Sequence, residues 1–171
     1  MARRGLVPRF HKGLRVTDAD ALECVKAAMA VTRIEVEAQL SQGLPNTPMA
    51  GSFMRVTGGN FITAKPVGVD EGVDYGFTGA VRKVIAEEIA ADLDQQNVVL
   101  MSPLGVSPAG EIFNMSMEAV AEAVAIGLKA EKLIYLCDAP GLLDAKGELI
   151  EAITADDAEA MLKAGEGMTE D

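Results

Sequence analysis

The most regular feature of the chain is a set of apolar residues repeated at helical spacing in four stretches. In the first, from Thr17 to about Gln42, apolar positions recur mostly three, four or seven residues apart, behind candidate N-caps and acidic residues. A run rich in glycine and proline then ends the pattern. The other three stretches are about 85–96, 116–130 and 154–163. Each pattern predicts a helix, and the first is the longest.

After the first helix the pattern changes to short β-type runs. Residues 53–57 and 61–65 flank Gly58-Gly59-Asn60, and the sequence predicts a hairpin about this turn. Two adjacent glycines could instead form a phosphate nest, because they let successive backbone amides converge on an anion. No helix follows at once and no lysine motif completes such a nest, so the turn is favoured.

A second β-type pair follows, around residues 73–75 and 80–84, and it brackets Gly76-Phe77-Thr78-Gly79. Residues 51–84 are therefore expected to form a strand-rich flap. The segment before Asp18 has little periodicity, and we expect a loop there with room for a short strand.

Two continuous apolar runs, 98–103 and 132–137, are typical of strands buried on both faces of a sheet. Residues 104–110, rich in glycine and proline, are expected to be a loop, and 148–150 a small strand. The order helix, strand, helix, strand with short links favours parallel strands joined by right-handed crossovers. The expected fold class is α/β, with a doubly wound, mainly parallel sheet flanked by helices.

Residues 113–118 form a strand end that leads directly into the third helix. Ser116 is a candidate N-cap, and Glu118 lies where the helix dipole favours negative charge. Polar side chains at the mouth of an α/β unit often bind ligands, which makes Asn114 a candidate contact. An ordinary capped core helix explains the same pattern.

Charge and aromatic content exclude several classes of protein. The 171 residues include 15 lysines and arginines against 26 aspartates and glutamates, which gives a formal net charge of −11. A general affinity for nucleic acid or for an anionic membrane is therefore not expected. Tryptophan is absent and aromatic residues make up 4% of the chain, so the core should be aliphatic and rich in alanine.

Cys24 and Cys137 lie far apart in the sequence, and two buried thiols explain them more simply than a disulfide or a metal site. His11 is the single histidine, so no cluster of histidine and cysteine ligands can form. The N-terminal residues lack the apolar segment of a signal peptide, and no apolar run approaches the roughly 20 residues of a membrane span. A soluble, cytoplasmic protein without a metal is expected.

Several stretches together resemble the amino-acid kinase fold family, in particular its N-acetylglutamate kinase and N-acetylglutamate synthase branch. Residues 13–18, Gly-Leu-Arg-Val-Thr-Asp, and 110–115, Gly-Glu-Ile-Phe-Asn-Met, are similar to its two substrate-side motifs. Residues 132–143 resemble its nucleotide-side strand and loop. The similarity runs from about His11 to the end of the chain.

The resemblance implies roles for four residues. Arg15 matches an arginine that grips the carboxylates of an N-acetylated amino acid, and its guanidinium can hold a carboxylate with two charge-assisted bonds. Considered by itself, Arg15 beside Asp18 would more often be a surface ion pair. Asn114 matches an asparagine that orients the acylated amino acid. Asp138 and Gly141 fall where the kinases border the nucleotide.

The chain also departs from the kinase pattern. Ser116 and Glu118 stand where a kinase has a second asparagine and an organising aspartate. The kinases also use one lysine in an N-terminal strand and another beyond the last residue here, and we expect both to be missing. Phosphoryl transfer depends on such cations, so no catalytic residue is assigned.

The synthase branch is the better match, over residues 15–18, 56–64, 68–75 and 129–133. The resemblance therefore implies a tail at 1–12 and an incomplete kinase-like domain at 13–171, with the acetyltransferase domain absent. Such a domain is a regulatory, arginine-sensing part of an enzyme that acetylates glutamate for arginine biosynthesis. The alternatives are a diverged N-acetylglutamate kinase and a non-catalytic module that binds arginine or an acylated amino acid.

The same resemblance implies the ligands and partners. We expect N-acetylglutamate, glutamate or arginine as ligand, an acetyltransferase domain in the same or a companion chain, and a homo-oligomer. No cofactor is expected in this chain. Acetyl-CoA would serve the full-length synthase, and ATP would be used only by a kinase.

Overall fold

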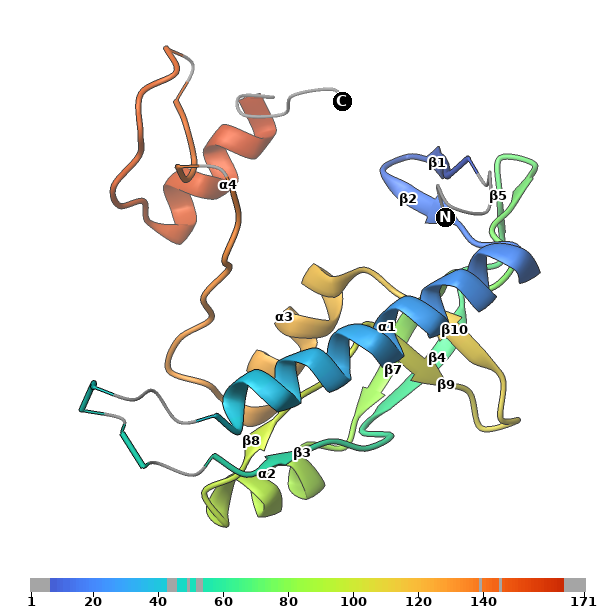
Figure 1. Cartoon of the computed structure of the whole chain (residues 1–171). Helices are drawn as coiled ribbons and strands as arrows, with labels where there is room; N and C mark the ends of the chain where they lie inside the picture. Colours follow the sequence, from blue (N-terminus) through green and yellow to red (C-terminus); the bar gives the residue numbers. More distant parts are fainter. Residues whose placement is uncertain are drawn as a thin grey trace. The chain divides into compact units, whose positions relative to one another are not determined.

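The computed structural model describes residues 7–42, 46–48, 50–51, 54–138, 140–144 and 146–164. It divides into two compact units, Met1–Leu133 and Ile134–Asp171, which are described separately below (Figure 1). The α/β fold class expected from the sequence is confirmed.

The first unit opens with an antiparallel hairpin of β1 (Arg9–His11) and β2 (Leu14–Val16), in which Phe10 lies opposite Arg15. The boundary expected at residue 12 falls inside this hairpin. Helix α1 (Ala19–Leu40) follows, and the Asp18 carboxylate caps it by accepting a hydrogen bond from the Ala21 amide at 2.8 Å. The long first helix is thus confirmed within two residues at each end.

The main sheet has four strands in the order β10-β9-β4-β7. β4 pairs antiparallel with β7 and parallel with β9, and β9 pairs antiparallel with β10. The strands are β4 (Ile62–Pro66), β7 (Gly79–Val84), β9 (Leu104–Val106) and β10 (Ile112–Asn114). The loop expected at 104–110 is therefore wrong in its first three residues, which form an ordered strand against β10.

Two smaller pairs complete the described strands of this unit. β3 (Val56–Thr57) lies parallel to β8 (Val98–Val99), and β5 (Val69–Asp70) lies antiparallel to β6 (Val73–Asp74). The hairpin expected about Gly58-Gly59-Asn60 is wrong, because the segments on its two sides belong to different sheets. Tight hairpin turns need residues with positive φ, and these three residues have none. Glu71 and Gly72, at φ 47° and 81°, make the actual tight turn between β5 and β6.

Helices α2 (Ala86–Asp94) and α3 (Met117–Leu128) contact each other, and α3 packs against β7. With the sheet they enclose an aliphatic core that contains one aromatic ring among its fully buried members. The core residues are Ile62, Ala64, Ile89, Phe113, Met115, Val120 and Val124. The expected aliphatic core and the expected positions of both helices are confirmed.

The strand expected at 132–137 is not found, since the described residues of this run have no strand assignment. Ile134 and Leu136 are 73% and 93% exposed. β8 is also shorter than expected and not buried on both faces, because Val98 is 37% exposed. An apolar run becomes a buried strand only where neighbouring strands accept its backbone hydrogen bonds.

The second unit contains one helix among its described residues, α4 (Ala155–Ala164). The Thr154 hydroxyl accepts a hydrogen bond from the Asp157 amide at 3.2 Å, as expected for its N-cap. In place of the small strand expected at 148–150, a single antiparallel bridge joins Leu143 and Leu149. In the described part of the chain, no helix is both long enough and apolar enough to cross a bilayer.

Truncating Ile89 should destabilise the first unit strongly. Ile89 is 1% exposed at the centre of the core, so Ile89→Ala removes apolar contacts and leaves a cavity that costs about 2–5 kcal/mol. Leu93→Ala, on the same helix at 44% exposure, is the matched control and should cost well under half as much. Urea unfolding followed by circular dichroism measures both, and equal losses would contradict the packing described here.

Candidate functional site

Arg15 lies on β2, and its guanidinium carbon is 5.0 Å from the centre of the Phe10 ring on the paired strand. This cation–π contact orients the side chain along the outer face of the hairpin. Phe10 is 58% exposed and Arg15 itself is half-buried, so the guanidinium lies beside a ring that solvent reaches. A guanidinium held in a fixed direction suits recognition of a carboxylate.

Asn114 ends β10, and a pair of buried threonines connects it to the Arg15 backbone. The Asn114 side-chain amide donates to the Thr17 hydroxyl at 3.1 Å, and that hydroxyl lies 3.1 Å from the Thr78 hydroxyl. Thr78 donates in turn to the backbone carbonyl of Arg15. Thr17 is 0% exposed and Thr78 is 4% exposed. The structure therefore links the Asn114 side chain to the backbone of Arg15, through two residues to which the sequence assigned no site role.

The segment Gly76-Phe77-Thr78 lies between Thr17 and Asn114 and pairs with both of them. Thr17 forms a parallel bridge with Gly76, and Thr78 forms another with Asn114. Gly76 has φ +57°, and a Cβ built on it would lie 2.6 Å from the Thr17 carbonyl oxygen. Only glycine meets both conditions without strain. This close approach was not visible in the sequence, where the residues only separate two β-type runs.

The tips of two hairpins are joined beside this junction. Lys12, in the β1–β2 turn, forms ion pairs with Asp70 at 2.7 Å and with Glu71 at 2.8 Å. Hydrogen bonding to Asp70 and then to Glu71 raises the pKa of Lys12, and the Lys12 ammonium lowers the pKa of Asp70. These groups are exposed, so they align the hairpins more than they stabilise the fold. The buried Tyr75 adds a hydrogen bond from its hydroxyl to the His11 carbonyl at 3.1 Å.

Ser116 and Glu118 act together at the N-terminus of α3. Ser116 accepts a hydrogen bond from the Ala119 amide at 3.2 Å and donates one to the Glu118 carboxylate at 2.6 Å. The hydrogen bond from Ser116, followed by one from the backbone amide of Glu118, lowers the pKa of Glu118. The predicted N-cap is confirmed. The arrangement caps the N-terminus of α3 and places a negative charge near the positive end of the helix dipole.

Asp138 and Gly141, expected beside a nucleotide, lie in the second unit and are described within it alone. Both are exposed. Gly141 has φ +141°, a backbone conformation that other residues rarely adopt. Their role at a nucleotide remains a prediction from the resemblance.

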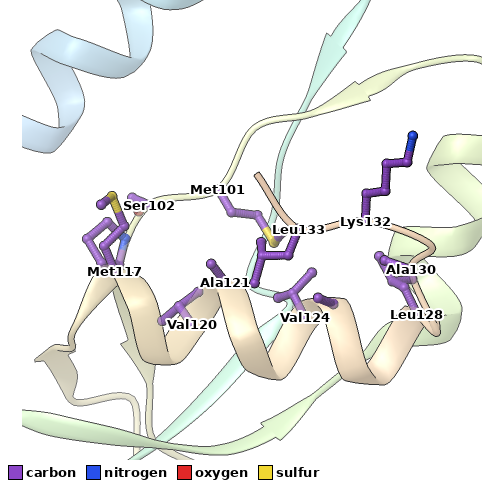
Figure 2. A pocket seen from close by; sticks show the side chains of 12 residues that line it. Met101, Ser102, Met117, Val120, Ala121, Val124, Leu128, Ala130, Lys132 and Leu133 are labelled. Carbon is purple, nitrogen blue, oxygen red and sulfur yellow. The ribbon is translucent and has the colours of Figure 1, made fainter. Parts of the chain in front are cut away.

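An apolar groove of about 360 Å³ runs along α3 in the first unit. Met101 and Leu133 lie on the same side of α3 as Val124, and the Lys132 amine points away from them (Figure 2). The groove contains none of the residues expected to bind a ligand. The described residues also contain no group of three or more acidic, histidine or cysteine side chains that could hold a metal ion.

Removing the Ser116 hydroxyl should raise the pKa of Glu118 and weaken α3. A lowered pKa in the folded state stabilises the fold above the unfolded value, near 4.3, and that contribution is lost as pH falls through the folded value. Ser116→Ala should therefore flatten the acid limb of the stability curve and cost about 1 kcal/mol at neutral pH. Ser116→Thr keeps the hydroxyl and is the control. Carboxyl-detected NMR titration tests the shift, and an unchanged Glu118 midpoint in Ser116→Ala would contradict it.

Comparisons with known proteins identify the family of this chain. The model of the amino acid kinase family matches residues 1–170. The amino-acid acetyltransferase of Azotobacter vinelandii is 48% identical over 163 residues, which cover 95% of this chain and 38% of that protein. The chain thus spans about two-fifths of the length of this relative.

Two solved structures of N-acetylglutamate synthase from Neisseria gonorrhoeae are also similar. The complex with coenzyme A and L-arginine has a TM-score of 0.87 and 34% identity, over 95% of this chain and 38% of that one. The complex with coenzyme A and N-acetyl-glutamate has a TM-score of 0.84 and 36% identity, over 95% of this chain and 36% of that one. Because the family model matches residues 1–170, almost the whole length of the chain, this chain belongs to the amino acid kinase family.

Proposed function

We propose that this chain is the kinase-like, ligand-binding part of an amino-acid N-acetyltransferase that acetylates glutamate. The observation that carries the proposal is the junction of Arg15 and Asn114 through Thr17 and Thr78 in a chain similar to amino-acid acetyltransferases. Its role is regulatory, and acetyl transfer from acetyl-CoA belongs to an acetyltransferase domain in the same or a companion chain.

The ligand is an amino acid or an N-acylated amino acid, bound by its carboxylate to Arg15. L-arginine and N-acetyl-glutamate are the ligands named for the two similar synthase structures, and both carry an α-carboxylate. A guanidinium can bind that group with two parallel hydrogen bonds. Asn114, whose amide can both donate and accept, would orient the rest of the ligand.

The polar groups at the N-terminus of α3 favour a regulatory role over phosphoryl transfer. Ser116 and Glu118 are bonded to each other and to the helix terminus. The carboxylate of Glu118 would repel a phosphate there unless cations offset it. ATP turnover is therefore not part of the proposed function.

Helix α1 supports the expectation of a homo-oligomer. Ala27, Val31, Ile34 and Ala38 recur four, three and four residues apart on one face. All four are exposed, with Val31 at 55% and Ile34 at 65%. This is the spacing of a helix–helix seam. We propose that a second copy covers it through a symmetric, antiparallel α1–α1 contact, in which Ala27 lies opposite Ala38 and Val31 lies opposite Ile34 of the second copy.

Ligand binding tests the proposed function directly. Isothermal titration of the chain with L-arginine and with N-acetylglutamate should show heat with at least one of them. Arg15→Ala should weaken that binding about 10-fold to 100-fold, the worth of a charge-assisted bond to a carboxylate. Arg9→Ala, on the same hairpin, is the control for lost charge and should bind normally. No heat with either ligand would refute the proposal, and ATP consumption with N-acetylglutamate would favour the kinase alternative.

A charge placed on the α1 seam should dissociate the oligomer. Ile34→Glu puts two carboxylates into the apolar contact, so the sedimentation coefficient should fall to that of a monomer. Val69→Glu, at a site 67% exposed on β5, is the matched control and should leave the assembly intact. A wild-type chain that sediments as a monomer at every concentration would contradict this assignment.

A further inference from the structure

We infer that Thr17 and Thr78 are positioning residues: their hydroxyls fix the orientation of the Asn114 amide and couple it to the Arg15 backbone. The consequence for ligand binding rests on the proposed function, whereas the positioning itself can be tested without any ligand. The segment Gly76-Phe77-Thr78 thereby acquires a role in the site.

The direction of the hydrogen bonds follows from counting protons. A hydroxyl carries one proton and two acceptor positions. Thr78 gives its proton to the Arg15 carbonyl and accepts from the Thr17 amide at 3.1 Å. The 3.1 Å contact between the two hydroxyls must then use the Thr17 proton. Thr17 Oγ1 is left to accept from Asn114 Nδ2.

The directions of these hydrogen bonds determine which end of the Asn114 side-chain amide is the nitrogen and which is the oxygen. Its nitrogen must face Thr17, because an oxygen there would meet a hydroxyl whose proton is already committed to Thr78. Oδ1 therefore points away from the threonines. From this position Oδ1 can accept a hydrogen bond from an N–H group of a bound amino acid or acylated amino acid, while Arg15 binds the carboxylate.

Burial makes the arrangement costly to change. Thr17 and Thr78 are almost completely buried, so a flipped amide would leave a polar group without a partner in the interior, at a cost of about 1–3 kcal/mol. The backbone is held independently of these hydroxyls. The Phe77 amide donates to the Thr17 carbonyl at 2.7 Å, and the Asn114 amide donates to the Phe77 carbonyl at 2.9 Å. Loss of one hydroxyl should therefore free the Asn114 side chain without separating the strands.

The wild-type chain provides the first test. In a 15N-labelled sample, the Asn114 side-chain protons should exchange with solvent at least tenfold more slowly than those of the exposed Asn60. One of the two Asn114 protons should also be shifted downfield by its bond to Thr17. Equal exchange rates for Asn114 and Asn60 would overturn the inference before any variant is made.

Two substitutions at Thr17 then separate the hydroxyl from the side-chain volume. Thr17→Val should abolish the downfield shift and the slow exchange of Asn114 Nδ2, while the Asn114 backbone amide keeps its protection. Thr17→Ser restores the hydroxyl and should restore both signals. If Thr17→Val does not fold, Thr78→Val removes the acceptor of the Thr17 proton. The Thr17 hydroxyl can then donate to Asn114 Oδ1, so the Asn114 amide should flip and its side-chain proton signals should change. Unchanged Asn114 side-chain signals in a folded valine variant would overturn the inference.

Ligand titration of the same variants tests the coupling. Thr17→Val should bind L-arginine or N-acetylglutamate about tenfold more weakly than Thr17→Ser. A wild-type chain that shows the expected NMR signals but binds neither ligand would refute the proposed function and leave the positioning intact. Altered NMR signals with unchanged affinity would refute the coupling.

Discussion

The first unit depends on satisfying the polar groups where three distant parts of the chain meet at Thr17. The chain entering α1, the segment after β6 and the end of β10 converge on a residue that is 0% exposed. No water reaches this point, so every donor and acceptor needs a protein partner. Two hydroxyls, one amide and several backbone groups meet that need together. The same bonds that close the interior also hold the backbone of Arg15 and the side chain of Asn114.

Local chemistry explains which elements the sequence could predict. Asp18, Ser116 and Thr154 each cap a helix where the sequence placed one, because a cap and an apolar period lie within a few residues of each other. Strand pairing depends on partners far along the chain. Val56 pairs with Val98 across 42 positions, and no local signal identifies that partner. The turn at Gly58-Gly59 was attractive in composition, yet its backbone lacks the positive φ that a hairpin requires.

The candidate site also contains residues that the sequence could identify and residues that it could not. Arg15 and Asn114 were recognisable because they belong to short motifs shared with a family, although their ligand roles remain proposals. Thr78 was not recognisable as a site residue, since a threonine between glycine-bounded β-type runs is ordinary in any flap. Its importance arises from Thr17, 61 positions away, and from the Arg15 carbonyl. The close contact of Gly76 with Thr17 likewise depends on how two distant segments pack together, which the local sequence does not reveal.

The N-terminus of α3 already carries a negative charge that belongs to the chain itself. A helix N-terminus attracts anions through its free amides and its dipole. Here the serine hydroxyl already uses one amide, and the Glu118 carboxylate supplies the negative charge. A phosphate would have to compete with that internal anion in a chain of net charge −11. The junction at Thr17 is built from neutral hydroxyls and an amide, so its geometry does not depend on that charge. A carboxylate-binding function can therefore persist where phosphoryl transfer is electrostatically disfavoured.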